Sequence, residues 1–423
     1  MNKALKLVTG IILAICLAFI PVIQVQPENH GILQLDHLIQ KHGLDNSYVG
    51  VEVRSMKTGE IVFEKNANKY FVPGSNQKLI TTWLGLTQLG PEFTFKTRIY
   101  VRSTSNLSTT NLKSGLLIEG SGDPTLTPSK IASEISRSIN NGPKTFSGPL
   151  LLDESKFDDQ YFGSGWMWDD DHNFILPLSF EDLKYTIDSP YDPKIVIEAL
   201  GQKIESALSE KNIALSGKIS EGKVESGWKK VVTLESKPLL QLLNEMNKHS
   251  INYYADMIWK TIGHEVGGEG SFQAACEIAK SSLEKIGVDP DLTFVDGSGL
   301  SRYNVITPRQ LTDLLAHTFS NPKLNGSNAD GYSYNLFSYE NDRNLFTSVL
   351  PDWGTGTLFS REHDLPVKAK TGTLEDSSTL SGYLKVKAGE DVLAFSIMVN
   401  RVREIEDARR FQDDLLRDLL DLS

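Results

Sequence analysis

Apolar and polar positions along the first ninety residues alternate between helical and strand-like patterns. A helical pattern covers residues 31–42, and short alternating runs over residues 48–63 surround Lys57-Thr58-Gly59, as expected of a β-hairpin. An apolar run over residues 75–89 opens after Pro73-Gly74, which is typical of a helix start. This stretch therefore predicts a helix, a hairpin and a second helix.

The pattern changes after Gly90-Pro91. Short β-rich runs separated by Gly, Ser, Asn and Pro extend to about Val232, with examples at residues 97–101, 115–119 and 149–152. One helical segment, residues 193–211, interrupts them. We expect residues 91–234 to form an inserted β-rich domain.

Helical periodicity returns in the last third of the chain and gives way to strands at its end. Helices are predicted at residues 237–246, 252–262, 272–285, 307–317 and 404–420, and strands at residues 367–370, 381–387 and 392–400. Strands at both ends of the chain with helices between them favour one α/β (α+β) domain, residues 30–90 plus 235–423, split by the insertion.

The N-terminus has the pattern of an export signal. Lys3 and Lys6 precede an apolar run over residues 7–25, and no small-x-small cleavage site follows. Residues 1–26 are thus either a cleaved signal peptide or a retained membrane anchor, because the run approaches the length that spans a bilayer. In both cases the remaining chain is expected outside the cytoplasm, in the periplasm or at the cell surface.

Charge and residue usage exclude several classes of function. The net charge of −11 disfavours a nucleic-acid partner, which needs a basic face. There is no His-Glu-x-x-His, paired cysteine or phosphate-loop pattern, so no metal or cofactor is expected. Removal of the signal would leave Cys276 as a single thiol, which we expect to be buried and inert.

Three short motifs occur in the order found in β-lactamases and penicillin-binding proteins. They are Ser75-Asn76-Gln77-Lys78, Ser250-Ile251-Asn252 and Lys370-Thr371-Gly372-Thr373. Each recurs elsewhere in the chain, for example Lys57-Thr58-Gly59, so their order and context carry the signal. A Ser-His-Asp triad stays open as an alternative, although no Gly-x-Ser-x-Gly turn is present.

The chemistry expected of these motifs is acyl transfer through a serine nucleophile. Ser75 and Lys78 share one helical face, so a neutral Lys78 can take the serine proton. Burial and a nearby cation such as Lys370 both favour that neutral form. Ser250 can pass a proton to the leaving amine, and Asn252 can hold Lys78 and a substrate amide.

The third motif is expected on an edge strand beside the nucleophile. Such a strand can hold an extended peptide through main-chain hydrogen bonds, and Gly372 lets a ligand approach the backbone. Lys370, Thr371 and Thr373 can bind a terminal carboxylate, while the backbone N–H groups of Ser75 and Thr373 can form an oxyanion hole.

The motifs and their surroundings resemble the class C low-molecular-weight penicillin-binding proteins, the D-alanyl-D-alanine carboxypeptidase/endopeptidase family S13. The likeness covers roughly residues 35–415 and departs from the family in Gly74, which stands where alanine is common. It is carried by Phe71–Leu79, Gly122-Asp123-Pro124-Thr125-Leu126, Gly165–Asp170, Asp296-Gly297-Ser298-Gly299-Leu300-Ser301-Arg302 and Leu350–Arg361.

The resemblance implies a β-lactamase/transpeptidase-like domain that cleaves peptidoglycan stem peptides at D-Ala-D-Ala and is acylated by β-lactams. It also implies that Asp169 or Asp170 holds the amino end of the peptide side chain, with Arg361 and Leu374 lining the same pocket. The segment between the first two motifs is shorter than in long family members, so the family's third small domain is expected to be reduced or absent.

Two other functions remain open at this stage. A β-lactamase or esterase of the same superfamily uses the same motifs, although no Glu-x-x-Leu-Asn deacylation motif is found. A non-catalytic cell-wall binding or sensor protein is the second alternative. Trp166, Trp168, Phe157 and Tyr161 are interpreted either as core residues or as a binding shelf.

Overall fold

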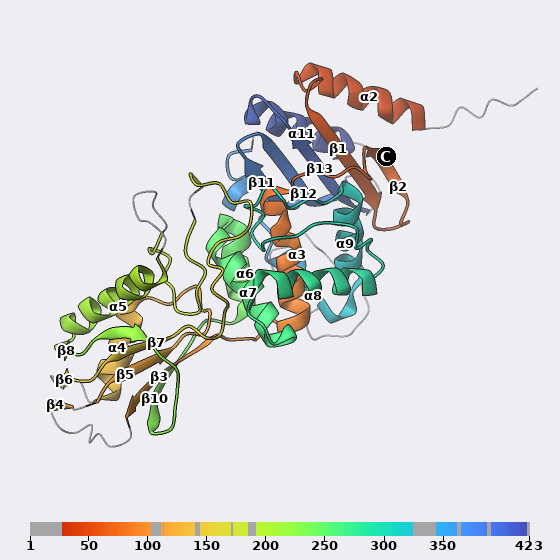
Figure 1. The fold of residues 1–423 in the computed structure, drawn as a ribbon. Helices are drawn as coiled ribbons and strands as arrows, with labels where there is room; N and C mark the ends of the chain where they lie inside the picture. The colour runs from red at the N-terminus through yellow and green to blue at the C-terminus, as the bar shows by residue number, and fades with distance from the viewer. Residues whose placement is uncertain are drawn as a thin grey trace, which may run out of the picture.

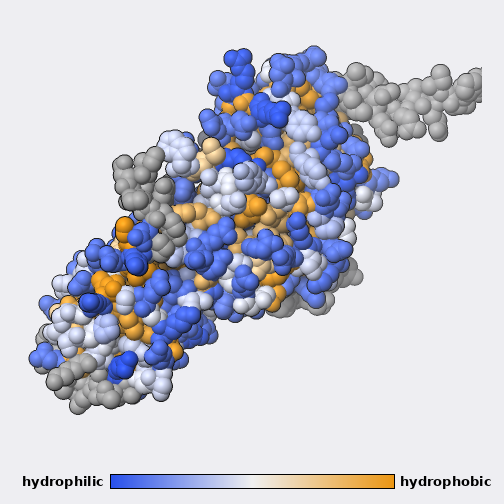
Figure 2. Space-filling model, in the orientation of Figure 1, coloured by the Kyte–Doolittle hydropathy of each residue, from blue (hydrophilic) through white to orange (hydrophobic). Residues whose placement is uncertain are grey.

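The computed structural model describes residues 28–102, 111–112, 114–139, 144–170, 172–184, 192–324, 344–361, 365–386 and 391–420. The expected signal or anchor, residues 1–26, lies outside these ranges. Within them, no helix has both the length and the apolar character needed to cross a membrane. Hydrophilic residues cover most of the visible face, with apolar positions scattered among them (Figure 2).

A five-stranded antiparallel sheet in the order β11-β12-β13-β1-β2 forms the centre of the larger lobe (Figure 1). Tyr48 of the first strand lies opposite Asn400 of the last, so the two ends of the chain complete one sheet. The strands are β1 (Tyr48–Ser55), β2 (Ile61–Lys65), β11 (Val367–Leu374), β12 (Ser377–Lys385) and β13 (Val392–Asn400). Strand β11 is an edge strand, as predicted for the third motif.

Helices cover both faces of this sheet, which explains why β12 and β13 are buried almost throughout. On one face, α2 (Glu28–Lys41) and α11 (Ile405–Leu420) pack over the strands (Figure 1). The other face carries the remaining large helices. They are α3 (Gln77–Leu84), α6 (Leu239–His249), α7 (Asn252–Gly267), α8 (Phe272–Lys285) and α9 (Pro308–Ser320).

The run predicted as one helix after Pro73 is three consecutive helical segments. A 3₁₀ turn, η1 (Gly74–Asn76), leads into α3, and a π-helical turn, η2 (Gly85–Leu89), ends it. Every residue of α3 is buried, so this helix runs through the core of the lobe. Shorter segments are α10 (Leu345–Ser348), η3 (Pro322–Leu324) and η4 (Gly356–Leu358).

The middle of the chain forms a second lobe with its own apolar core, made of residues from Ile99 to Leu234 (Figure 1). One sheet has the order β10-β3-β5-β7-β9 and the other the order β4-β6-β8. Their strands are β3 (Lys96–Arg102), β4 (Asn111–Leu112), β5 (Leu116–Glu119), β6 (Lys144–Phe146), β7 (Leu150–Asp153), β8 (Ile213–Leu215), β9 (Ile219–Glu221) and β10 (Trp228–Glu235).

Two helices, and not the single one expected, pack in this lobe. The predicted helix is α5 (Pro193–Glu210), and the unexpected one is α4 (Pro128–Ser138). Thr127 caps α4 through the Lys130 N–H, but only a few apolar residues on its buried side mark the helix in sequence. We retain as a proposal that residues 91–234 are an inserted domain with a reduced or missing third small domain.

A buried lysine of α7 joins the two lobes. The Lys260 ammonium pairs with the carboxylate of Asp158 and donates to the carbonyl of Gln160 at 3.0 Å. It also lies 5.2 Å from the ring centres of both Phe157 and Phe272. Because the Lys260 ammonium is fully buried, these partners must compensate for its loss of hydration.

We predict that Asp158→Ala lowers the free energy of unfolding by about 3 kcal/mol, because it leaves the Lys260 charge buried without its counterion. Lys260→Met should cost less, since it removes the charge and keeps an apolar chain between the two rings. Urea unfolding of both variants measures the difference. Equal losses would contradict this account of the junction.

Candidate active site

The first motif lies where the chain turns from β-structure into α3. Ser75 sits in η1 and is half-buried, while Lys78, one turn further, is fully buried. The Lys78 amine is 2.8 Å from the Ser75 hydroxyl, 2.7 Å from Asn252 Oδ1 and 2.7 Å from the Ser298 carbonyl. Residues from three separate parts of the chain therefore converge on one nitrogen.

These three partners match the bonding capacity of a neutral amine. The Ser298 carbonyl can only accept, and so can the oxygen of Asn252, so they take the two N–H groups that a neutral lysine has. In the neutral form the lone pair is left to accept from the Ser75 hydroxyl, whereas in the charged form a third N–H donates to the Ser75 oxygen. In this arrangement Lys78 is placed to receive the serine proton.

Burial lowers the pKa of Lys78 to about 8, against the opposing negative charges of Asp256 and Asp296. A group with that pKa is partly neutral near physiological pH and can act as a base. Burial and a neighbouring cation, Lys370, are both predicted from the sequence to favour the neutral form of Lys78. In the structure, desolvation is the leading cause.

The second motif spans the connection between α6 and α7. Ser250 adopts the left-handed conformation with φ 56°, and Asn252 is the first residue of α7, where the sequence predicts that helix to begin. The Lys370 amine donates to the Ser250 hydroxyl at 2.9 Å and to the Thr371 carbonyl at 2.9 Å. Burial, and then the charge of Lys78, hold the pKa of Lys370 well below its usual value.

Two glycines let the backbone of η1 meet that of β11. Gly74 has φ +50°, and a Cβ there would lie 3.2 Å from the Thr373 nitrogen. A Cβ on Gly372 would lie 2.9 Å from the Ser75 nitrogen. The positive φ explains why glycine replaces the family's usual alanine at position 74. The backbone nitrogens of Ser75 and Thr373 thus lie on either side of one narrow junction.

A cavity of about 310 Å³ opens in front of the nucleophile. Ser75, Ser250, Thr371 and Thr373 line it. Lys78 and Lys370 are buried and Asn252 is half-buried, and none of these three lines the cavity. Its other lining residues are Thr357, Ser360, Arg361, Glu406, Arg409 and Asp413. The three motifs that are far apart in sequence therefore meet at one accessible serine.

The sequence profile of the D-Ala-D-Ala carboxypeptidase 3 (S13) family matches residues 32–179 and 195–419, which is most of the chain. The chain belongs to this family. The resemblance stated from the motifs is thereby confirmed, as is the expected activity of a serine-type D-Ala-D-Ala peptidase, a hydrolase.

Individual relatives agree with this assignment. A D-alanyl-D-alanine carboxypeptidase from Actinomadura sp. (strain R39) is 26% identical over 86% of this chain and 80% of its own length. The D-alanyl-D-alanine carboxypeptidase DacB of Haemophilus influenzae is 23% identical over 84% of this chain and 86% of its own.

Solved structures share the fold. Penicillin-binding protein 4 of H. influenzae superposes with a TM-score of 0.78 at 21% identity, covering 92% of this chain and 99% of that protein. A penicillin G-acylated endopeptidase from Bdellovibrio bacteriovorus gives a TM-score of 0.58 at 19% identity, covering 88% and 91%. The expected α/β (α+β) fold of the β-lactamase/transpeptidase type is confirmed.

Three family positions expected in the substrate pocket lie outside the lining of this cavity. Asp169 is exposed, and Asp170 forms an ion pair with Arg302. Leu374, at the end of β11, is half-buried. Their roles in holding the peptide side chain therefore stay predictions that rest on the resemblance.

Arg361 does line the cavity, but its guanidinium donates its hydrogen bonds to residues of α11. Nη1 donates to the Asp413 carboxylate and the Arg409 carbonyl, at 2.8 and 3.0 Å, and Nη2 to Gln412 Oε1 at 2.8 Å. Burial lowers the pKa of Arg361, and the nearby Asp413 carboxylate opposes this shift. The hydrogen bonds of Arg361 therefore hold α11 beside the cavity.

The four aromatic residues that the sequence leaves as either core residues or a binding shelf differ in their burial. Phe157 and Tyr161 are buried, whereas Trp168 is among the most exposed apolar residues described. Trp166 is partly buried and donates its indole N–H to Asp296 at 2.8 Å.

Two buried carboxylates lie behind Lys78. The sequence suggested a role for neither, although Asp296 opens one of the stretches that carry the family resemblance. Asp256 Oδ1 accepts the N–H groups of Gly297 and Ser298 at 2.9 and 3.0 Å, and thereby holds the carbonyl that binds Lys78. Asp296 accepts from Gly299 and Ser301 in the same loop. Asp256 follows Asn252 by four residues on α7, a helical spacing that could have singled it out.

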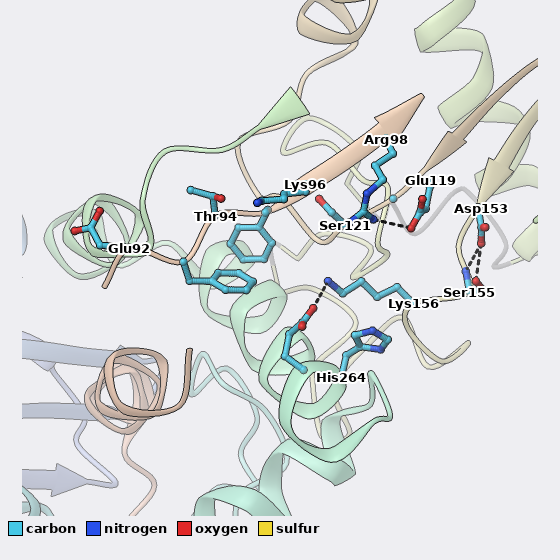
Figure 3. A pocket seen from close by; sticks show the side chains of 14 residues that line it. Glu92, Thr94, Lys96, Arg98, Glu119, Ser121, Asp153, Ser155, Lys156 and His264 are labelled. Atoms are coloured by element: carbon cyan, nitrogen blue, oxygen red, sulfur yellow. Dashed lines mark hydrogen bonds and ion pairs between the residues drawn. The ribbon is translucent and has the colours of Figure 1, made fainter. Parts of the chain in front are cut away.

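A larger cavity, about 590 Å³, lies elsewhere, at the junction of the lobes beside the C-terminal part of α7 (Figure 3). Its charged side chains are largely satisfied by one another, as in the pairs Arg98–Glu119 and Lys156–Glu265. None of the motif residues lines it. In the described part of the chain, no cluster of His, Cys, Asp or Glu is arranged to hold a metal ion.

We predict that Asp256→Asn shifts the acid limb of the acylation pH profile to lower pH. The substitution keeps an oxygen for the Gly297 and Ser298 N–H groups but removes a carboxyl whose ionised form raises the pKa of Lys78. Burial and the charge of Asp296 raise the pKa of Asp256 well above its usual value, so the shift reflects the ionised fraction of Asp256. Because the base must be neutral, the wild-type rate should rise with pH through about 8, and the variant rate should rise earlier.

The measurement is the acylation rate by a chromogenic β-lactam or the kcat/KM for a D-Ala-D-Ala peptide between pH 5 and 10. Asp153→Asn is the matched control, since buried Asp153 also accepts a backbone N–H and is not among the charges acting on Lys78. An unshifted acid limb in Asp256→Asn would leave Asp256 with a purely structural role.

Proposed function

We propose that the chain hydrolyses the peptide bond after a D-alanine in peptidoglycan stem peptides through an acyl-enzyme at Ser75. The observation that carries this assignment is the single amine of Lys78, held at 2.8 Å from the Ser75 hydroxyl by two acceptors that leave its lone pair free. Ser75 is the nucleophile and Lys78 is the general base.

In the acylation step, the Ser75 oxygen bonds to the scissile carbonyl carbon while its proton passes to Lys78. The backbone N–H groups of Ser75 and Thr373 stabilise the negative charge that develops on the carbonyl oxygen. The C–N bond then breaks, and the proton taken up by Lys78 passes by way of Ser250, hydrogen-bonded to Lys370, to the leaving nitrogen, which leaves Lys78 neutral again. Asn252 orients Lys78 and the substrate amide.

The terminal carboxylate of the substrate is proposed to bind Thr371 and Thr373, beside Lys370. A negative charge there would favour the protonated form of Lys370, whose pKa is otherwise held down by burial. A charged Lys370 in turn disfavours a charge on Lys78. Substrate binding would thus help to keep the base neutral at the moment when it must accept a proton.

Release of the acyl group requires water. Water attacks the ester carbon, the bond to the Ser75 oxygen breaks, and the serine recovers its proton as the peptide leaves with a carboxylate. β-Lactams carry a strained amide in place of the peptide bond and are proposed to acylate Ser75 in the same way. Penicillin-binding protein 4 of H. influenzae has been solved with a β-lactam, and the B. bacteriovorus endopeptidase with penicillin G.

The proposed site of action is outside the cytoplasm, where peptidoglycan lies. This proposal rests on the basic and apolar pattern of residues 1–26. The protein would contact the membrane only if that segment is retained as an anchor. Asp169, Asp170, Leu374 and Arg361 are proposed to shape the substrate pocket, the last by positioning α11.

We predict a covalent adduct on Ser75 after incubation with benzylpenicillin, detected by intact-protein mass spectrometry and mapped by peptide digestion. Ser75→Ala should give no adduct and should abolish turnover of a D-Ala-D-Ala peptide, while circular dichroism stays unchanged. Rapid hydrolysis of penicillin without an adduct would favour a β-lactamase. Peptidoglycan binding with neither adduct nor hydrolysis would favour a binding or sensor protein.

A further inference from the structure

The cavity in front of Ser75 continues well past the residues proposed to hold the terminal carboxylate. Besides Thr371 and Thr373, its lining includes Glu406, Arg409 and Asp413 of α11. Cavities of this size, about 310 Å³, typically enclose ligands with many more atoms than one alanine. The site therefore has space for a larger leaving group than a terminal D-alanine.

This additional space lies on the leaving-group side of the scissile bond. Ser250, the proposed donor to the leaving amine, lines the cavity together with the two threonines proposed to bind the carboxylate. Asp170 and Leu374, which the family resemblance places against the acyl part of the peptide, are absent from the lining.

Two charged side chains at the far end differ in how firmly they are held. Arg361 is buried and is committed to the Asp413 carboxylate and to Gln412. Arg409, whose side chain is 39% exposed, contacts only an exposed carboxylate in the described structure, Glu406 Oε2 at 3.4 Å. A long contact between two exposed side chains is weak and is readily exchanged for a better partner.

We propose that Arg409 binds a carboxylate of a leaving group that extends beyond the scissile residue, as the second stem peptide of a cross-linked dimer does. A guanidinium can hold a carboxylate through two parallel hydrogen bonds, which suits a site that must recognise an anionic peptide. Glu406 then competes with the substrate for the same guanidinium. This inference rests on the proposed peptidase activity at Ser75 and assigns its preference for cross-linked substrates to α11.

The test compares two defined substrates, a monomeric pentapeptide ending in D-Ala-D-Ala and a cross-linked dimer without a terminal D-Ala-D-Ala. The readout is the ratio of kcat/KM for the dimer to kcat/KM for the pentapeptide, with products separated by liquid chromatography and identified by mass spectrometry. Arg409→Gln should lower this ratio roughly tenfold, the usual effect of losing one hydrogen bond to a charged group. Glu406→Gln should raise it.

Arg410→Gln is the matched control. Arg410 is the next residue of α11, pairs with Asp407 and does not line the cavity, so its loss should leave the ratio unchanged. A dimer whose leaving-stem carboxylates are amidated should show the same ratio in wild type and Arg409→Gln.

An unchanged ratio in Arg409→Gln would overturn the inference while pentapeptide turnover still supports the proposed function. If wild type turns over neither substrate in a Ser75-dependent manner, the proposed function fails, and the inference fails with it.

Discussion

The burial of one lysine amine among three oxygen atoms is the constraint on which the active site depends. A buried ammonium is costly, and a neutral amine buried without partners is also costly, so Lys78 is tolerated because each of its bonding positions is used. Its acceptors come from α7 and from the loop after α8, so any movement of either element would leave a polar group unsatisfied. The geometry of the base is thus coupled to the packing of the whole larger lobe.

The sheet supplies the second half of that constraint. Strands from both ends of the chain form it, and this closure sets β11 as an edge strand against η1. Gly74 and Gly372 allow the two backbones to approach within a distance that a side chain would prevent. A nucleophile on one element and a peptide-binding edge on another are thereby held in register by main-chain contact, and long flexible side chains are not needed for that purpose.

Local patterns in the sequence were sufficient for the motifs and for most elements, because each depends on residues close in the chain. The helix α4 was missed since its buried side carries few apolar residues, and its cap and proline are weak signals alone. Asp256 was missed for a different reason. Its partners, Gly297 and Ser298, lie some forty residues away, so only tertiary structure shows that it supports Lys78.

The same distinction explains why Arg361 could be placed near the pocket but not given its role. The family resemblance implies that Arg361 lines the substrate pocket, whereas its side-chain hydrogen bonds go to α11. Catalysis and selectivity then depend on different physical environments. The proton-transfer groups are buried and over-determined by their contacts, while Arg409 is exposed and held by one weak pair. Substitutions of exposed residues usually cost little stability. Substitutions at Arg409 on α11 can therefore change which leaving group is preferred without disturbing the base, Lys78.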